Sequence, residues 1–252
     1  MNDVMTSTDG ISGQASHLKL IIILLVDISG SMRGSKIQQV NYAIKQVLPV
    51  IQRLEEEERV RVFLSTIVFS TTARWHGGDQ PVEVATFCWD DVYSDGGSTA
   101  TAQAIELLCS ALHTTKIGRR SYPPVCILLS DGHCTDTEDR YNEAIRRLDT
   151  DPWGVKAVRL SIGIGGQGSY NKAQLDAFIT PYLRAEQRVE TLPADTPRKL
   201  VEYIVLAATT ATQKAKAVHP TSLIAPVMLG MDDLQNAAVV DPAILPDPNQ
   251  VF

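Results

Sequence analysis

The hydrophobic positions along the chain follow two patterns, one typical of buried strands and one typical of helices. The segment 17–27 contains the unbroken apolar run Leu20–Val26 and ends at Asp27, which predicts a strand covered on both faces. From 35 to 58 the apolar residues recur mostly three and four apart, which predicts an amphipathic helix. Pro49 lies inside this helix and is expected to kink or divide it. The apolar stripe consists of Ile37, Val40, Ile44, Val47, Leu48, Ile51 and Leu54.

The alternation of strand and helix patterns continues along most of the chain. Runs rich in apolar and β-branched residues predict strands at 59–70, 125–129 and 155–164, and a short one near Val189. A hairpin-like excursion is expected around His76-Gly77-Gly78. Helical spacing predicts helices at 99–112, 136–148, 171–182 and 197–212. Because neighbouring parallel strands need right-handed crossovers, this order predicts an α/β fold, with a doubly wound, mostly parallel sheet flanked by helices.

Composition separates the chain into one domain and two tails. Residues 1–16 are rich in Ser, Thr, Gly, Asp and Asn and show no periodicity, which predicts a flexible N-terminal tail. The strand and helix patterns occupy residues 17–213, which we expect to form the domain. From 214 to 252 prolines punctuate scattered apolar residues. This pattern predicts an extended C-terminal tail that either packs on its own domain or docks onto a partner.

Overall composition narrows the class of protein. Of 252 residues, 44% are hydrophobic and 21% are charged, as in ordinary globular proteins. The formal net charge of −6 disfavours a general nucleic-acid binder, because such proteins neutralise phosphates with a basic face. The apolar runs are too short to span a membrane, and residues 1–16 lack the features of a signal peptide. The four cysteines have no C-x-x-C spacing, so we expect free thiols and a cytoplasmic protein with neither nucleic-acid nor membrane partners.

Three loops carry the candidate chemistry, and two of them follow buried strands. Asp27-Ile28-Ser29-Gly30-Ser31 follows the first strand, Ser130-Asp131-Gly132 follows the strand at 125–129, and Gly96-Gly97-Ser98-Thr99 opens a helix. Because the carboxyl ends of parallel strands meet at one edge, two carboxylates and three hydroxyls can converge there. Oxygen ligands suit a hard cation, and we expect Mg²⁺, which keeps several waters and needs only one or two carboxylates. Mn²⁺ and Ca²⁺ are the alternatives.

The order of these motifs resembles the metal-ion-dependent adhesion site (MIDAS) of the von Willebrand factor type A (VWA) domain. The resemblance extends over about Leu18 to Thr212 and matches all five ligand positions. It implies that the two aspartates act mainly through water and that the two serines and the threonine contact the metal directly or nearly so. It also implies that a protein partner supplies an acidic residue as the remaining ligand. The expected metal ligands are Asp27, Ser29, Ser31, Thr99 and Asp131.

Within that family the chain is most similar to the bacterial tellurite-resistance TerY group. The similarity lies in three segments: LLVDISGSMRGSKIQQVNYAI, GGSTATAQAIELL and ILLSDGHCTD. Members of that group are encoded beside a protein kinase and a PPM-type protein phosphatase in stress-response and conflict systems. The resemblance therefore implies a non-enzymatic adaptor or scaffold inside the cell, with a kinase and a PPM-type phosphatase among its partners.

The same residue types also occur for reasons unrelated to a MIDAS. Asp, Ser and Thr at strand ends form turns and helix caps, but this does not account for three loops at one edge. A metal-dependent hydrolase or phosphatase using the same cluster is the alternative function, and only His133 and Cys134 offer it a base or nucleophile. A haloacid-dehalogenase-like phosphatase needs a second acid where this chain has Ser29. The segment Gly163–Gly168 fits G-x-G-x-x-G, but a glycine turn after a strand is favoured over a dinucleotide site.

Overall fold

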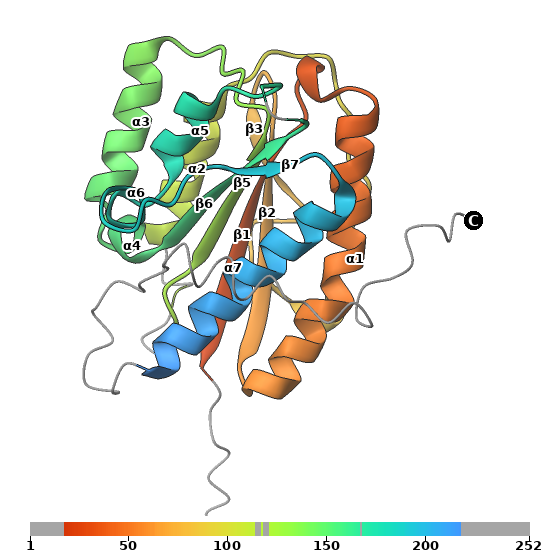
Figure 1. The fold of residues 1–252 in the computed structure, drawn as a ribbon, viewed down its shortest axis with the longest axis vertical. Coiled ribbons are helices and arrows are strands. Elements are labelled where there is room, and N and C mark those ends of the chain that lie inside the picture. Colours follow the sequence, from red (N-terminus) through yellow and green to blue (C-terminus); the bar gives the residue numbers. More distant parts are fainter. Residues whose placement is uncertain (1–17, 114–116, 118–120, 167, 218–252) are drawn as a thin grey trace, which may run out of the picture.

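A computed structural model describes residues 18–113, 117, 121–166 and 168–217 of the chain. The expected N-terminal tail, residues 1–16, and all but the first four residues of the expected C-terminal tail, 214–252, lie outside the described residues. The described part forms a central sheet with helices on both faces (Figure 1). This is the mostly parallel, helix-flanked α/β architecture that the strand and helix patterns predict.

The sheet has five parallel strands and two short antiparallel ones. The parallel strands are β1 (Lys19–Asp27), β2 (Arg61–Phe69), β5 (Val125–Ser130), β6 (Val158–Ile164) and β7 (Leu192–Ala194). Antiparallel to β2 run β3 (Ala73–His76) and β4 (Val82–Glu83). The strand order is β3-β2-β1-β5-β6-β7, with β4 also paired to β2. The strand with the longest apolar run, β1, is therefore central, between β2 and β5.

Seven helices in the described part connect or follow these strands. They are α1 (Ser35–Glu58), α2 (Thr101–His113), α3 (Glu138–Thr150), α4 (Pro152–Lys156), α5 (Lys172–Phe178), α6 (Pro181–Ala185) and α7 (Pro197–Ala217). Two short 3-10 turns, Gly30–Met32 and Val84–Thr86, lie within loops. None of the helices in the described part is both long and apolar enough to cross a membrane.

Residues of β1 belong alternately to two cores, one on each face of the sheet. Its even-numbered residues from Leu20 to Val26 pack in a core shared with α1 and α7, and its odd-numbered residues from Ile21 to Leu25 pack in a core shared with α2 and α3. In Figure 1, α1 and α7 accordingly cover one face and α2 and α3 the other. Burial on both faces explains why this strand is apolar without interruption.

Several predicted boundaries differ from the observed ones for physical reasons. Helix α1 is not divided, because Lys45 is exposed and Pro49 is not in the buried stripe, so the carbonyl that loses its hydrogen bond lies on the water-facing side. The expected helix at 171–182 is two helices, because a residue before proline disfavours helical geometry, and Thr180, which precedes Pro181, has a non-helical ψ of 127°.

The last two strands, β6 and β7, also begin at later residues than expected. The expected strand at 155–164 starts only at Val158, because Asp151 caps α4 by accepting hydrogen bonds from the backbone nitrogens of Trp153 and Gly154 at 2.8 Å. The short strand expected near Val189 is β7, which begins at Leu192.

Candidate metal centre

Asp27 is the last residue of β1 and is fully buried. Its Oδ1 accepts a hydrogen bond from the backbone nitrogen of Ser29 at 2.8 Å, and its Oδ2 accepts one from the Ser130 hydroxyl at 2.6 Å. Burial raises the pKa of Asp27, hydrogen bonds from Ser130 and Ser29 oppose this, and the charge of Asp131 raises it further. The carboxylate is therefore held in one orientation in a place where its negative charge is poorly solvated.

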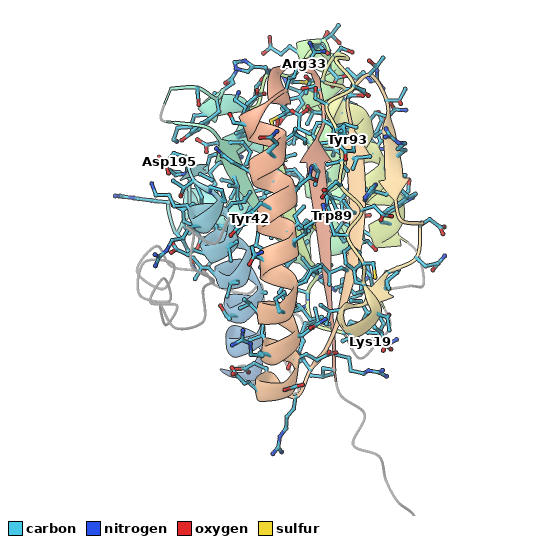
Figure 2. The ribbon with its side chains drawn as sticks, turned by 90° about the vertical axis from the view of Figure 1, so that its right-hand side faces the viewer. Lys19, Arg33, Tyr42, Trp89, Tyr93 and Asp195 are labelled. Carbon is cyan, nitrogen blue, oxygen red and sulfur yellow. The ribbon has the colours of Figure 1, made fainter. Side chains whose placement is uncertain are left out.

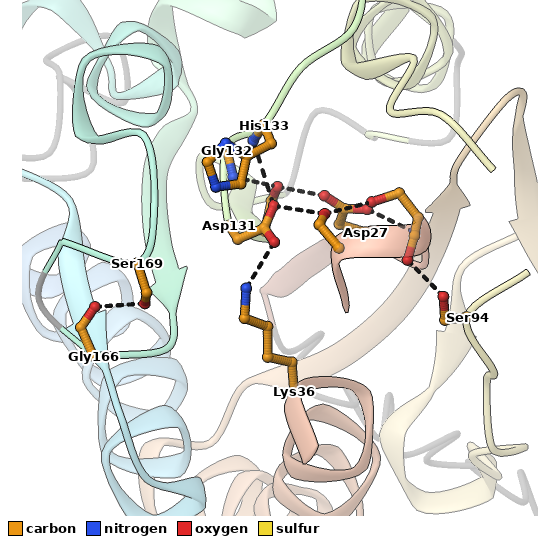
Figure 3. A network of polar contacts seen from close by, with 11 residues as sticks. Asp27, Lys36, Ser94, Asp131, Gly132, His133, Gly166 and Ser169 are labelled. Carbon is orange, nitrogen blue, oxygen red and sulfur yellow. Dashed lines mark hydrogen bonds and ion pairs between the residues drawn. The ribbon is translucent and has the colours of Figure 1, made fainter. Parts of the chain in front are cut away.

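Hydrogen bonds connect the loop after β1, which begins at Asp27, to the second aspartate, Asp131. The hydroxyls of Ser29 and Ser31 lie 3.1 Å apart, and Ser31 donates a hydrogen bond to Oδ1 of Asp131 over 3.1 Å. Asp131 follows β5 and is also fully buried. Figure 3 shows this chain of polar contacts between the two carboxylates. Four of the five residues expected at the site, Asp27, Ser29, Ser31 and Asp131, are thus brought together.

Thr99 lies in the neighbouring loop, shortly before α2, and is 3% exposed. Its backbone nitrogen donates to the Thr135 hydroxyl at 2.9 Å, and its carbonyl accepts from the Thr135 nitrogen at 3.0 Å. Within the described residues, the hydrogen bonds that connect the other four expected ligands do not include the Thr99 hydroxyl. The structure therefore places Thr99 through its backbone, in a loop that touches the first one.

Glycine allows those two loops to approach each other. The backbone nitrogen of Gly30 donates to the carbonyl of Gly97 at 3.0 Å. A Cβ atom on Gly30 would lie 3.3 Å from the carbonyl oxygen of Gly96, which is tighter than ordinary contact. Glycine at this position therefore lets backbone pack against backbone beside Ser29 and Ser31.

The segment that leads to Thr99 is anchored on α1. The Asn41 side chain donates to the carbonyl of Val92 at 2.8 Å and accepts from the Val92 nitrogen at 3.0 Å and from the Trp89 indole at 3.1 Å. Figure 2 shows Trp89 and Tyr93 on this segment beside α1. Farther along, the Ser94 hydroxyl donates to the carbonyl of Ser29 at 2.6 Å. A buried amide on α1 thus fixes the backbone that reaches the site.

Three further side chains contact the site, although none was among the expected metal ligands. Ser130 holds Asp27, as described above, and Lys36 places its Nζ 2.8 Å from Oδ2 of Asp131. Asp95 accepts hydrogen bonds from the Gly97 nitrogen at 2.9 Å and from the Ser70 hydroxyl. The sequence contained a signal for two of them. Asp95 precedes a pair of glycines, which is typical of a turn stabilised by the aspartate side chain. Lys36 lies in the first turn of the expected helix, where a positive charge opposes the helix dipole and therefore indicates a partner elsewhere.

The residues considered for an enzyme do not form a catalytic pair. His133 is exposed, and its contact with the site is from its backbone nitrogen to Oδ1 of Asp131 at 3.4 Å. The Cys134 thiol donates to Oδ2 of Asp136 at 3.2 Å, and burial raises its pKa. A raised pKa disfavours the thiolate, which is the nucleophilic form. Within the described residues, the Cys134 thiol donates its hydrogen bond to a carboxylate and not to the imidazole of His133.

The glycine run at the end of β6 is a turn. Gly165 has a φ of 113°, which favours glycine, and the next helix begins only at Lys172. The Tyr170 ring covers Gly163, since a Cβ there would lie 2.8 Å from ring atoms. In a dinucleotide fingerprint the helix opens within the glycine motif. This geometry agrees with a glycine turn, as the sequence favours.

The donor set suits a hard divalent cation. All the side-chain donors that converge are oxygens, namely two fully buried carboxylates and the hydroxyls of Ser29 and Ser31. Hard cations such as Mg²⁺ and Ca²⁺ prefer oxygen ligands, and a positive charge would offset the poor solvation that raises the pKa of Asp27. The residues present therefore fit a metal of this class.

Solved structures of similar fold include several domains from bacteria and animals. A von Willebrand factor type A protein from Catenulispora acidiphila is 16% identical, with a TM-score of 0.51, over 78% of this chain and 43% of its own. Proximal thread matrix protein 1 from the mussel byssus, with a zinc-occupied MIDAS motif, is 17% identical, with a TM-score of 0.55, over 76% and 48%. The PilB minor pilin of Streptococcus sanguinis is 12% identical, with a TM-score of 0.58, over 82% and 64%.

These similarities concern the fold, and the chain spans between 43% and 64% of the length of those three proteins. No curated protein matches the sequence. The family model of the von Willebrand factor type A domain matches residues 22–181, a range that contains both aspartate loops and Thr99. The chain therefore belongs to the von Willebrand factor type A domain family.

Proposed function

We propose that this chain is a non-enzymatic interaction module that binds Mg²⁺ at Asp27, Ser29, Ser31, Thr99 and Asp131 and grips an acidic residue of a protein partner. VWA domains often mediate metal-dependent protein interactions. The observation that carries the proposal is the convergence of two fully buried carboxylates, Asp27 and Asp131, through the hydroxyls of Ser29 and Ser31.

The residues of the site divide the work of binding. When bound, a divalent cation supplies a coordination position open to a carboxylate of the partner. Asp27 is oriented by Ser130 and by the backbone of Ser29, so its charge is preorganised. The hydroxyls of Ser29 and Ser31 contribute neutral oxygens, so they add no further negative charge that would repel the carboxylate of an acidic partner. The bond from Ser94 to the Ser29 carbonyl supports a position for Thr99 in the same site, because it ties the segment that leads to Thr99 to the first loop.

The cellular setting belongs to the same proposal. The similarity to the tellurite-resistance TerY group supports an adaptor of a stress-response or conflict system that works with a protein kinase and a PPM-type phosphatase. All four cysteines are unpaired, which supports a reducing compartment such as the cytoplasm. The Cys134 thiol donates a hydrogen bond to Asp136 and not to His133, so the two residues do not form a nucleophile and base pair. This supports a binding function without catalysis.

The test measures metal binding and partner capture with matched variants. Asp27→Asn removes the charge while keeping the shape of the side chain and an acceptor for the Ser29 nitrogen. Asp91→Asn is the control. Asp91 is an exposed aspartate on the segment that leads to Thr99, and it pairs with Lys45 of α1. Calorimetry with Mg²⁺ should show binding by wild type and Asp91→Asn and its loss in Asp27→Asn, with circular dichroism confirming that each is folded.

Capture from the native lysate then addresses the partner. With Mg²⁺, wild type and Asp91→Asn should retain the same protein, and EDTA or Asp27→Asn should release it. Equal capture under all conditions would contradict a metal-dependent grip and assign binding to another surface. Absence of Mg²⁺ binding by folded wild type would contradict the proposal at its first step.

A further inference from the structure

Lys36 is the cation at the candidate metal centre. It is the second residue of α1, and its Nζ lies 2.8 Å from Oδ2 of Asp131. The Asp131 side chain is fully buried and that of Lys36 is 25% exposed. Figure 3 shows the lysine reaching from α1 to Asp131, on the side away from the hydroxyl of Ser94. This ion pair joins residues 95 positions apart in the sequence, so it exists only because the fold forms the site.

The position of Lys36 on its own helix is unfavourable for a cation. Positive charge near a helix N-terminus opposes the dipole, and the first turn of α1 contains no acidic residue that would compensate. The lysine stem instead passes the glycine turn after β6, where a Cβ on Gly165 would lie 3.6 Å from Cε of Lys36. The ammonium group is therefore placed by the carboxylate of the site and not by contacts within α1.

The four carboxylate oxygens of the site are held in two different ways. Oδ1 of Asp27 accepts from the Ser29 backbone, Oδ2 of Asp27 from the Ser130 hydroxyl, and Oδ1 of Asp131 from the Ser31 hydroxyl. These donors are a backbone nitrogen and two short serine side chains, which can rotate but cannot move away from the site while the loops keep their structure. Oδ2 of Asp131 accepts from the long, flexible side chain of Lys36. Rotation of one side chain is enough to release this oxygen.

We propose that Lys36 is a built-in counter-cation that competes with a divalent metal for Asp131, so that metal binding displaces the ammonium group. The proposal rests on the function proposed above and adds its regulation: Lys36 sets the metal concentration at which the site is loaded. Without metal, Lys36 neutralises part of the charge of the two buried carboxylates and stabilises the folded site. With metal, the same charge is released towards the rim of the site.

Two lysines on α1 give a matched test. Lys36→Met removes the charge and keeps most of the aliphatic side chain beside Gly165. Lys45→Met is the control, because it removes the charge of an exposed lysine whose Nζ lies 2.8 Å from the Asp91 carboxylate. In calorimetry, Lys36→Met should bind Mg²⁺ on the order of tenfold more tightly than wild type, because one positive charge next to the metal is removed. Lys45→Met should match wild type. In EDTA, Lys36→Met should melt at a lower temperature than wild type, and Mg²⁺ should raise its melting temperature by more.

The outcomes separate this proposal from the function on which it rests. If wild type binds Mg²⁺ and folded Lys36→Met binds it equally or more weakly, the competition is overturned and the metal-dependent function stands. If Lys36→Met binds Mg²⁺ and wild type does not, Lys36 has taken the place of the metal, which supports the competition and overturns the function. If neither folded protein binds, both are overturned. Lys36→Gln gives the same comparison should the methionine variant fail to fold.

Discussion

The Ser130 hydroxyl donates a hydrogen bond to Oδ2 of Asp27 over 2.6 Å, joining the ends of β5 and β1 across 103 positions of sequence. The same hydroxyl accepts from the backbone nitrogen of Gly132 at 2.8 Å. Ser130 therefore ties the loop that begins at Asp27 to the loop that contains Asp131. Because β1 and β5 are neighbouring parallel strands, the sheet itself brings these two ends together.

Replacement of Ser130 by alanine should lower both stability and metal affinity. The change leaves a buried carboxylate oxygen without its donor, which costs about 1–3 kcal/mol. Urea unfolding should detect this loss, and calorimetry with Mg²⁺ should detect weaker binding because Asp27 is no longer fixed. Ser110→Ala is the control, since Ser110 is exposed and its hydroxyl donates to a carbonyl of its own helix. Equal stability of the two variants would argue against this bond as a support of the site.

Gly132, which follows Asp131, should not tolerate a side chain. Its φ is 69°, and a Cβ there would lie 2.8 Å from the carbonyl oxygen of Asn171 and 2.9 Å from the Leu175 side chain. We expect Gly132→Ala to lower the free energy of unfolding by about 1–3 kcal/mol and to weaken Mg²⁺ binding by shifting Asp131. Gly166→Ala in the loop after β6 has open space and should unfold like wild type. A wild-type melting temperature for Gly132→Ala would contradict the strain argument.

The sequence was sufficient to predict the sheet and the convergence of Asp27, Ser29, Ser31 and Asp131 at one of its edges, because strand ends are defined by short-range patterns. The apolar run of β1 and its terminal aspartate are adjacent in sequence, and the parallel order of strands then brings Asp27 and Asp131 to one edge. Ser29 and Ser31 followed from the same loop. These expectations needed only the period of the hydrophobic pattern and the rule that parallel strands share an edge.

What was missed depends on how far individual side chains reach. Lys36 meets Asp131 across 95 positions, and no short-range pattern specifies that a lysine side chain will bend toward a particular loop. Similarly, the break between α5 and α6 depends on one proline, Pro181, in an otherwise helical pattern. The role of Ser130 required its register opposite Asp27, which becomes definite only when β1 and β5 are aligned.

Asp176 should make stability depend on pH in the acid range. Burial pushes its pKa upward, but hydrogen bonds from Lys172 and Thr191 together bring the pKa below its ordinary value of 3.8. A carboxyl with a lowered pKa contributes stability above its unfolded pKa, and this contribution is lost as the pH falls through the folded pKa. Asp176→Asn should therefore be less stable than wild type by about 1 kcal/mol at pH 6, with a difference that shrinks below pH 3.8.

Urea unfolding at several pH values checks this expectation. Glu143→Gln is the control, because Glu143 and Arg146 form an exposed pair on α3 whose loss should matter little at any pH. A constant difference between Asp176→Asn and wild type from pH 6 to pH 3 would mean that its charge does not support the fold.

The ion pair between Arg159, which is fully buried, and Asp149, which is 25% exposed, should make stability depend on the two residues together. The Arg159 side chain on β6 is fully buried, its guanidinium donates to Asp149 on α3, and it lies 6.0 Å from the centre of the Phe178 ring. Asp149→Ala removes the carboxylate that pairs with this guanidinium and leaves a buried positive charge, which costs about 3 kcal/mol. Replacing both residues, as Arg159→Met with Asp149→Ala, should recover part of that loss, because the guanidinium that lost its carboxylate is then removed as well. Guanidinium unfolding of the two single variants and the double variant measures the coupling, and strictly additive losses would show that the two charges do not depend on each other.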